Sequence, residues 1–177
     1  TDSITVAGVG DMSGDVFGNG LLCSQAVKLV AAFDHRDIFI DPNPDPKKSF
    51  AERQRLFDLP RSSWQDYNKK LISTGGGIFS RSAKSIPLSS EIKTLLGFDE
   101  SQSSATPNEV MKAILKSHAD LVWFGGIGTY IKSSQENNSE VGDRANDLIR
   151  IDGKDLNCQV VAEGGNLACN QRGRNEA

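Results

Sequence analysis

The run Ile4-Thr-Val-Ala-Gly-Val-Gly-Asp-Met-Ser-Gly-Asp-Val-Phe-Gly-Asn-Gly20 decides the fold of this chain. Its first residues are apolar and typical of a strand, its middle is rich in glycine, and a helix-like stretch follows it. Strand, glycine loop and helix form the order that a dinucleotide site requires. We expect Gly8 to make the tight turn, Gly10 to let the backbone approach a pyrophosphate, and Gly14 to let the helix pack closely.

The spacing of these glycines departs from a strict G-x-G-x-x-G pattern. The third glycine falls at Gly14 rather than at Ser13, so a merely tight strand–helix turn stays an alternative. No Gly-Lys-Ser/Thr follows at the spacing of a phosphate-binding P-loop. We predict a helix over 14–33 with Ser13 as its N-cap, and N–H groups at its start that face phosphates.

An acidic residue follows the next apolar run. The sequence predicts a second strand over 38–40, which ends at Asp41, about 20 residues after Gly20. In a βαβ unit, an acid at this place accepts hydrogen bonds from the adenosine ribose hydroxyls. The alternative is that Asp41 opens the turn Asp-Pro-Asn-Pro-Asp-Pro46, and both roles are compatible.

Composition limits the class of protein. A length of 177 residues suits one domain, and we expect residues 1–177 to be a single domain taken from a longer protein. A net charge of -3 argues against a nucleic-acid or membrane-surface partner, and no apolar run reaches membrane-spanning length. Three widely spaced cysteines, Cys23, Cys158 and Cys169, indicate reduced thiols in a cytoplasmic protein rather than disulfides or a metal site.

Strand-like and helix-like stretches alternate along the chain. We predict further helices over 47–59, 63–73, 88–96, from Thr106 onward, and weakly over 141–149. The Thr106-Pro-Asn-Glu109 sequence has the pattern of a capping box. Further strands are predicted over 121–124 and 159–162. This alternation predicts an α/β fold, namely a Rossmann-like, doubly wound and mostly parallel sheet.

Two more glycine motifs directly follow predicted strands. Gly125-Gly-Ile-Gly-Thr129 comes after the strand over 121–124, and Glu163-Gly-Gly-Asn166 comes after the strand over 159–162. Each alone fits an ordinary turn. Because ligands of open α/β sheets bind at the carboxyl ends of the strands, three such loops together favour a site there. Asn166 offers an amide donor and acceptor suited to a carboxamide.

The motifs together resemble a known family. GVGDMSGDVFGNG, FIDPNPDP, STGGGIFSR, GGIGTY, GDRAND and AEGGNL are similar to the very large NAD-specific glutamate dehydrogenases of bacteria, over essentially the whole chain. The resemblance implies an NAD-binding domain of an enzyme that converts L-glutamate, NAD and water to 2-oxoglutarate, ammonium and NADH. It also implies a cytoplasmic, homo-oligomeric parent enzyme that takes its substrate through a separate domain.

The resemblance assigns cofactor-binding roles to matching positions. The implied set is Gly8, Gly10, Met12, Ser13 and Gly14 at the pyrophosphate, Asp41 at the ribose, and Gly126, Ile127, Gly128 and Asn166 near the nicotinamide. Asp11 departs from the smaller glutamate dehydrogenases, which have a neutral residue there. The family's catalytic lysine and aspartate lie in an upstream substrate domain, so we assign no catalytic residue and no metal ligand here.

Two other functions fit parts of the pattern. An S-adenosylmethionine-dependent methyltransferase also has a glycine loop after its first strand and an acid after its second, but it does not need the later glycine loops. A non-catalytic nucleotide-sensing module is the alternative outside enzymes. Arg81 and Lys84 follow the Gly75-Gly-Gly77 connection and could either meet an anion or simply lie exposed.

Overall fold

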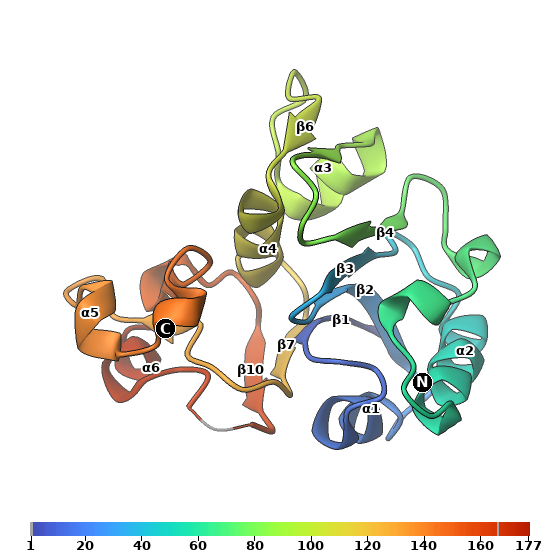
Figure 1. Cartoon of the computed structure of the whole chain (residues 1–177), viewed down its shortest axis with the longest axis horizontal. Helices are drawn as coiled ribbons and strands as arrows, with labels where there is room; N and C mark the ends of the chain where they lie inside the picture. The colour runs from blue at the N-terminus through green and yellow to red at the C-terminus, as the bar shows by residue number, and fades with distance from the viewer. Residues whose placement is uncertain (1, 166) are drawn as a thin grey trace.

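The chain folds around one six-stranded sheet in the computed structural model, which describes residues 2–165 and 167–177. The strands lie side by side in the order β10-β7-β1-β2-β3-β4, with helices on both faces (Figure 1). Their bounds are β1 Ile4–Val9, β2 Val27–Phe33, β3 Asp37–Ile40, β4 Gly77–Ser80, β7 Leu121–Phe124 and β10 Val160–Glu163. The predicted Rossmann-like α/β fold is therefore confirmed.

Five of these strands, all except β3, share one direction. β1 pairs in parallel with β2 and with β7, and β7 pairs in parallel with β10. β3 runs antiparallel to both β2 and β4. The chain builds β2 to β4 on one side of β1 and then crosses to build β7 and β10 on the other. This reversal beside β1 is the place where ligands of such sheets bind.

The helices bury one stripe each against the sheet. α1 (Asp15–Leu21) and α2 (Pro46–Asp58) cover one face, while α3 (Ser90–Leu96) and α4 (Pro107–Leu115) cover the other (Figure 1). The predicted capping box at Thr106 is confirmed, because Thr106 Oγ1 accepts from Glu109 N at 3.3 Å and Glu109 Oε2 accepts from Thr106 N at 2.7 Å. Ser89 caps α3, and a left-handed Gly97 ends it.

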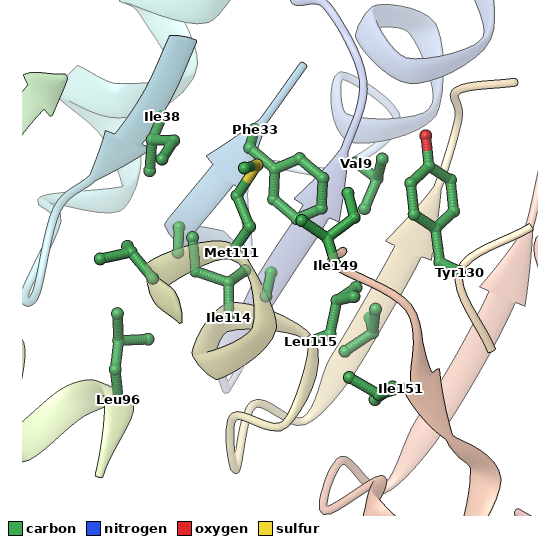
Figure 2. Close-up of a cluster of buried hydrophobic side chains, with 14 of the residues drawn as sticks. Val9, Phe33, Ile38, Leu96, Met111, Ile114, Leu115, Tyr130, Ile149 and Ile151 are labelled. Atoms are coloured by element: carbon green, nitrogen blue, oxygen red, sulfur yellow. The ribbon is translucent and has the colours of Figure 1, made fainter. Parts of the chain in front are cut away.

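Successive side chains along each strand point to opposite faces of the sheet, so the core has two layers. On β3, Ile38 and Ile40 face the side of α4, whereas Phe39 faces the side of α2. Figure 2 shows the first layer, which contains Met111 and Ile114 of α4 together with Phe33 and Val9 of the sheet. Full burial of each such side chain stabilises the fold by about 1.5–3 kcal/mol.

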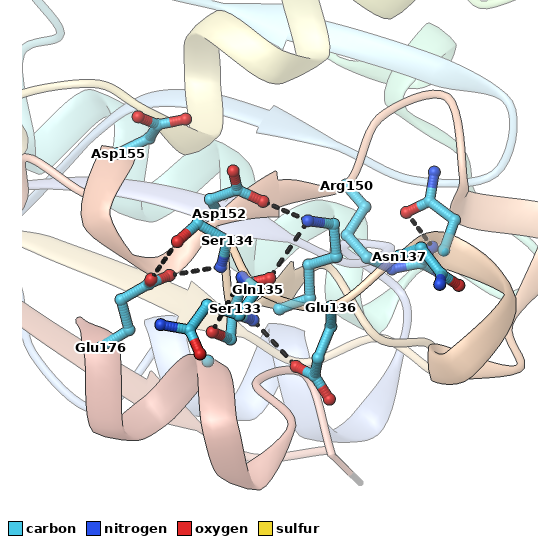
Figure 3. A network of polar contacts seen from close by, with 12 residues as sticks. Ser133, Ser134, Gln135, Glu136, Asn137, Arg150, Asp152, Asp155 and Glu176 are labelled. Atoms are coloured by element: carbon cyan, nitrogen blue, oxygen red, sulfur yellow. Dashed lines mark hydrogen bonds and ion pairs between the residues drawn. The ribbon is translucent and has the colours of Figure 1, made fainter.

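A smaller C-terminal part packs beside β10. It contains the short strands β8 (Ile131–Lys132) and β9 (Ile151–Asp152), and the helices α5 (Asn138–Val141) and α6 (Gln171–Glu176). Figure 3 shows the polar contacts that join it: Glu176 of α6 accepts from Ser134 N at 2.8 Å and Ser134 Oγ at 2.5 Å, and Lys132 pairs with Asp152. A further two-stranded sheet joins β5 (Ile86–Pro87) and β6 (Ser104–Ala105).

The predicted helix over 14–33 is wrong in its second half. α1 ends at Leu21, and residues 27–33 form β2 instead. Two glycines weaken the helix after its first turn, and the run Val-Lys-Leu-Val-Ala-Ala-Phe33 is apolar enough to be a buried strand. Ser13 is not the N-cap either, because Gly14 occupies that position.

Other local predictions also differ. The predicted helix over 63–73 is two separate 3-10 turns, Trp64–Asp66 and Lys69–Leu71, and the helix over 141–149 is only the 3-10 turn Arg144–Asn146. A fourth 3-10 turn spans Gly153–Asp155. β4 was not predicted, because the glycines before it suggested a loop. In the part of the chain that the structure describes, no helix is long and apolar enough to cross a membrane.

Candidate functional site at the carboxyl edge of the sheet

The three glycine loops meet at one edge, as predicted. Gly10, Gly125 and Gly164 directly follow β1, β7 and β10, and backbone bonds continue the sheet into the loops: Gly125 N donates to Val9 O at 2.9 Å, and Gly164 N donates to Phe124 O at 2.8 Å. Between the first two loops lies a cleft of about 750 Å³, a volume in the range of small-molecule sites. It is lined by Val9, Gly10, Asp11, Gly14, Asp15, Val16, Phe17, Asp34, His35, Arg81, Gly125, Gly126, Ile127, Tyr130, Ala145 and Asn146.

Phe17 explains the glycines at the base of the cleft. A Cβ on Gly10 would lie 2.6 Å from Phe17 Cβ, and a Cβ on Gly125 would lie 2.7 Å from it. A Cβ on Gly8 would lie 2.4 Å from the Phe17 ring. These glycines are therefore required first by the packing of a buried phenylalanine. A larger residue at Gly10 must displace Phe17 before it can obstruct a ligand.

This packing gives a stability prediction with an internal control. Gly125→Ala should lower the free energy of unfolding by at least about 1 kcal/mol, the usual cost of overpacking a core. Gly126→Ala should cost much less, because its Cβ would meet nothing closer than Val9 O at 3.5 Å. Urea denaturation of both variants tests this. Equal midpoints and slopes for the two proteins would contradict the role of Phe17.

Two residues of the first loop, Met12 and Ser13, do not line the cleft, although Asp11 does. Met12 is buried in the core between the sheet and α2. Ser13 N and Ser13 Oγ both donate to the Asp11 carboxylate, at 3.1 and 2.9 Å, so this carboxylate is hydrogen-bonded within the loop itself. Of the predicted pyrophosphate residues, Gly10 and Gly14 line the cleft, while Gly8, Met12 and Ser13 are not among its lining residues.

The structure does not bring Asp41 to this edge. β3 is antiparallel, so its end lies at the opposite edge of the sheet, where Asp41 N donates to Val30 O. Asp41 is 0% exposed, and its Oδ1 accepts from Ser73 N at 3.1 Å and from Ser73 Oγ at 2.5 Å. These contacts hold the loop before β4.

Asp34 occupies the place that sequence reasoning assigned to Asp41. It follows β2, the parallel strand next to β1, and lines the cleft at 7% exposure. Its Oδ1 accepts from Arg36 N and Asp37 N, at 2.7 and 2.8 Å, which forms the β2–β3 turn. Burial raises the pKa of the Asp34 carboxyl. The signal was present in the sequence, because Asp34 follows Gly14 by the usual 20 positions.

Arg81 brings a positive charge to the cleft. Its Nη1 donates to Asp34 O at 2.8 Å, and its charge also lies close enough to Tyr130 to act on the pKa of that phenol. Lys84, the other candidate of the same segment, is exposed and is not a lining residue. Of the two, only Arg81 is placed to meet an anion in the cleft.

The loop after β7 forms the wall of the cleft opposite the loop after β1. Gly126 and Ile127 line the cleft, and Ile127 is 93% exposed. Tyr130 stacks on Phe124 and donates its hydroxyl to Ile127 O at 3.0 Å, which fixes the loop from below. Gly128 has φ +133, and its Cβ would lie 2.4 Å from Asn146 Nδ2. The predicted residue Asn166 lies outside the described residues.

Comparisons with known proteins agree on one group. A family model described as "Bacterial NAD-glutamate dehydrogenase, catalytic domain" matches residues 1–177. The chain is similar to proteins named NAD-specific glutamate dehydrogenase: it is 62% identical to that of Halomonas elongata, 59% to that of Pseudomonas aeruginosa and 52% to that of Mycobacterium tuberculosis. Each match covers 99% of this chain but only 11% of the relative.

Proposed function

Because the chain belongs to the bacterial NAD-glutamate dehydrogenase family, we propose that residues 1–177 form the NAD-binding part of an enzyme that oxidises L-glutamate. The parent enzyme would release 2-oxoglutarate, ammonium and NADH. The observation that carries this proposal is the cleft at the carboxyl edge, lined by two glycine loops on either side of the reversal in strand order.

We place the cofactor across this cleft from β2 to β7. The adenosine ribose lies at Asp34, whose charged carboxylate accepts hydrogen bonds from its hydroxyls. The pyrophosphate crosses Gly10 and Gly14, where Arg81 offers a compensating charge. The nicotinamide then reaches the loop at Gly126 and Ile127. NAD supplies the acceptor for the hydride, while these residues hold and orient it.

The local packing changes what we propose for the other predicted contacts. Ser13 N is already bonded to Asp11, and Met12 is buried, so we expect the pyrophosphate to use the loop at Gly10 and Gly14 instead. Gly128 supports the wall through its fit against Asn146. Asn166 keeps the role near the nicotinamide that the family resemblance implied. The family membership gives no support to the methyltransferase alternative.

NAD is expected to bind in preference to NADP. A 2′-phosphate on the adenosine ribose would lie against the Asp34 carboxylate, and such like-charge contacts cost enough to weaken binding by at least about tenfold. His35 and Arg81 stand beside Asp34 and would reduce this penalty without removing it. Calorimetric titration of the protein with each cofactor measures the ratio. Equal affinities would overturn the placement, and no affinity for either would overturn the proposed function.

A further inference from the structure

Asn146 is a cleft residue of the GDRAND motif, to which the sequence alone assigned no binding role. It ends the 3-10 turn Arg144–Asn146, far along the chain from the glycine loops, and yet it lines the cleft beside the loop after β7. It is only 9% exposed. Its amide has a partner at one end only, and the other end is not one of the buried atoms that lack a partner in the described part of the chain, so it is open to the cleft.

Chemistry fixes which end of the amide is free. Asn146 Nδ2 lies 2.7 Å from Asp143 Oδ2. A carboxylate has no proton to give, so the amide nitrogen must face it and the amide oxygen must face away. Within residues 2–165 and 167–177, no group donates a hydrogen bond to Asn146 Oδ1. An acceptor without a partner is therefore presented at the wall of the cleft.

The surrounding contacts hold this acceptor in place. Asp143 Oδ2 also accepts from Thr129 N at 2.8 Å, which ties the Asn146 turn to the end of the glycine loop. Arg150, whose side chain is 0% exposed, donates from Nε to Thr129 O at 2.8 Å and from Nη2 to Asp143 O at 2.5 Å. It lies at the edge of the polar network in Figure 3. Gly128 and Asn146 are thus parts of one rigid wall.

The position of this wall in the sheet indicates which half of the cofactor it would contact. Asp34 follows β2, whereas this wall follows β7, on the other side of β1. If the adenosine lies at Asp34, the nicotinamide lies here. The other described lining residues of this wall are Gly125, Gly126, Ile127, Tyr130 and Ala145, and none of them has a side-chain carbonyl. The amino group of the nicotinamide carboxamide donates hydrogen bonds, and the Asn146 amide oxygen is a side-chain acceptor suited to it.

We propose that Asn146 Oδ1 accepts a hydrogen bond from the carboxamide amino group of NAD and so sets the orientation of the nicotinamide ring. This inference rests on the proposed function. Asn146 touches the cofactor in this proposal, while Asp143 and Arg150 act through it as positioning residues.

The test compares two cofactors on the full-length parent enzyme. NAD carries the amino group, and its 3-acetylpyridine analogue carries a methyl group in the same place. Asn146→Ala should raise the dissociation constant for NAD by about fivefold to tenfold, the effect of one lost hydrogen bond, and should leave that of the analogue nearly unchanged. A general loosening of the wall would instead raise both constants together and leave their ratio as in the wild type.

Asn138→Ala serves as the matched control. Asn138 Oδ1 accepts from Arg150 Nη1 at 3.0 Å, but Asn138 does not line the cleft, so its loss disturbs the same network without removing a ligand contact. It should leave the ratio of the two constants unchanged. ADP-ribose, which lacks the nicotinamide, should bind the Asn146→Ala enzyme as it binds the wild type. If it does not, Asn146→Ser, which keeps a hydroxyl for Asp143, repeats the comparison.

The outcomes separate the two proposals. An unchanged ratio in the folded Asn146 variant, or an equal change in Asn138→Ala, overturns the role of Asn146 and leaves the NAD site standing. Failure of the wild-type enzyme to bind NAD overturns the proposed function itself.

Discussion

The isolated chain of residues 1–177 is expected to bind NAD and to show no measurable oxidation of L-glutamate, whereas the full-length parent enzyme is expected to oxidise it. Hydride transfer requires glutamate to be held against the nicotinamide, which contributes about 7–11 kcal/mol in well-oriented reactions. Release of ammonium requires acid–base groups, which contribute about 10²–10⁴-fold. The expected loss therefore exceeds about 10⁷-fold.

The wall of the cleft after β7, where we propose that the nicotinamide lies, explains this expectation. Among its described residues, the only titratable side chain is that of Tyr130, whose hydroxyl is bonded to Ile127 O and whose pKa is raised by burial. It is therefore not suited to exchange protons at neutral pH. The family resemblance places the catalytic lysine and aspartate in another domain.

The measurement follows the absorbance of reduced nicotinamide with saturating L-glutamate and NAD. Cooperative unfolding and an NAD titration of the same preparation serve as controls for a folded, loaded site. Turnover that survives repurification and disappears in Asp34→Ala would mean that residues 1–177 hold a complete active site.

Asp34→Ala is expected to weaken NAD binding by about 1–3 kcal/mol, which corresponds to about 5- to 150-fold. The change removes the carboxylate at the end of β2 that we propose as the acceptor of the ribose hydroxyls. It also removes the bonds to Arg36 N and Asp37 N, so Asp34→Asn, whose amide oxygen can keep those bonds, separates the charge from the turn.

Asp41→Ala is the matched control. It should leave NAD binding within about twofold and should instead lower the free energy of unfolding, because Asp41 holds Ser73 at the opposite edge of the sheet. Calorimetry with NAD and urea denaturation of both variants give the two readouts. Loss of binding in Asp41→Ala together with normal binding in Asp34→Ala would restore Asp41 as the ribose acid.

Local rules of sequence determined much of the fold. The glycine loop after β1, the capping box of α4 and the buried strand β7 were all predicted correctly, because each depends on residues within about ten positions of one another. The meeting of the three glycine loops followed as well, since parallel strands bring their carboxyl ends to one edge.

Errors arose where a local pattern fitted two structures. The stretch 27–33 is apolar in a way that suits a buried helix or a buried strand, and treating it as helix shifted the second strand of the βαβ unit to β3. The ribose acid was then expected at Asp41, whereas the cleft leads us to propose Asp34. Only the pairing of β2 with β1 distinguishes the two, and that pairing is a contact between distant parts of the chain.

The sequence by itself therefore determined the fold class, the family and the edge of the sheet at which the cleft lies. Tertiary structure alone decided which side chains line it. Phe17 beneath the glycines, Arg81 beside Asp34, and Asn146 against Gly128 each reach the cleft from a different segment. No rule of sequence spacing predicts that such residues come together. The length and sequence of the chain between them can vary, whereas their close packing in the folded protein cannot.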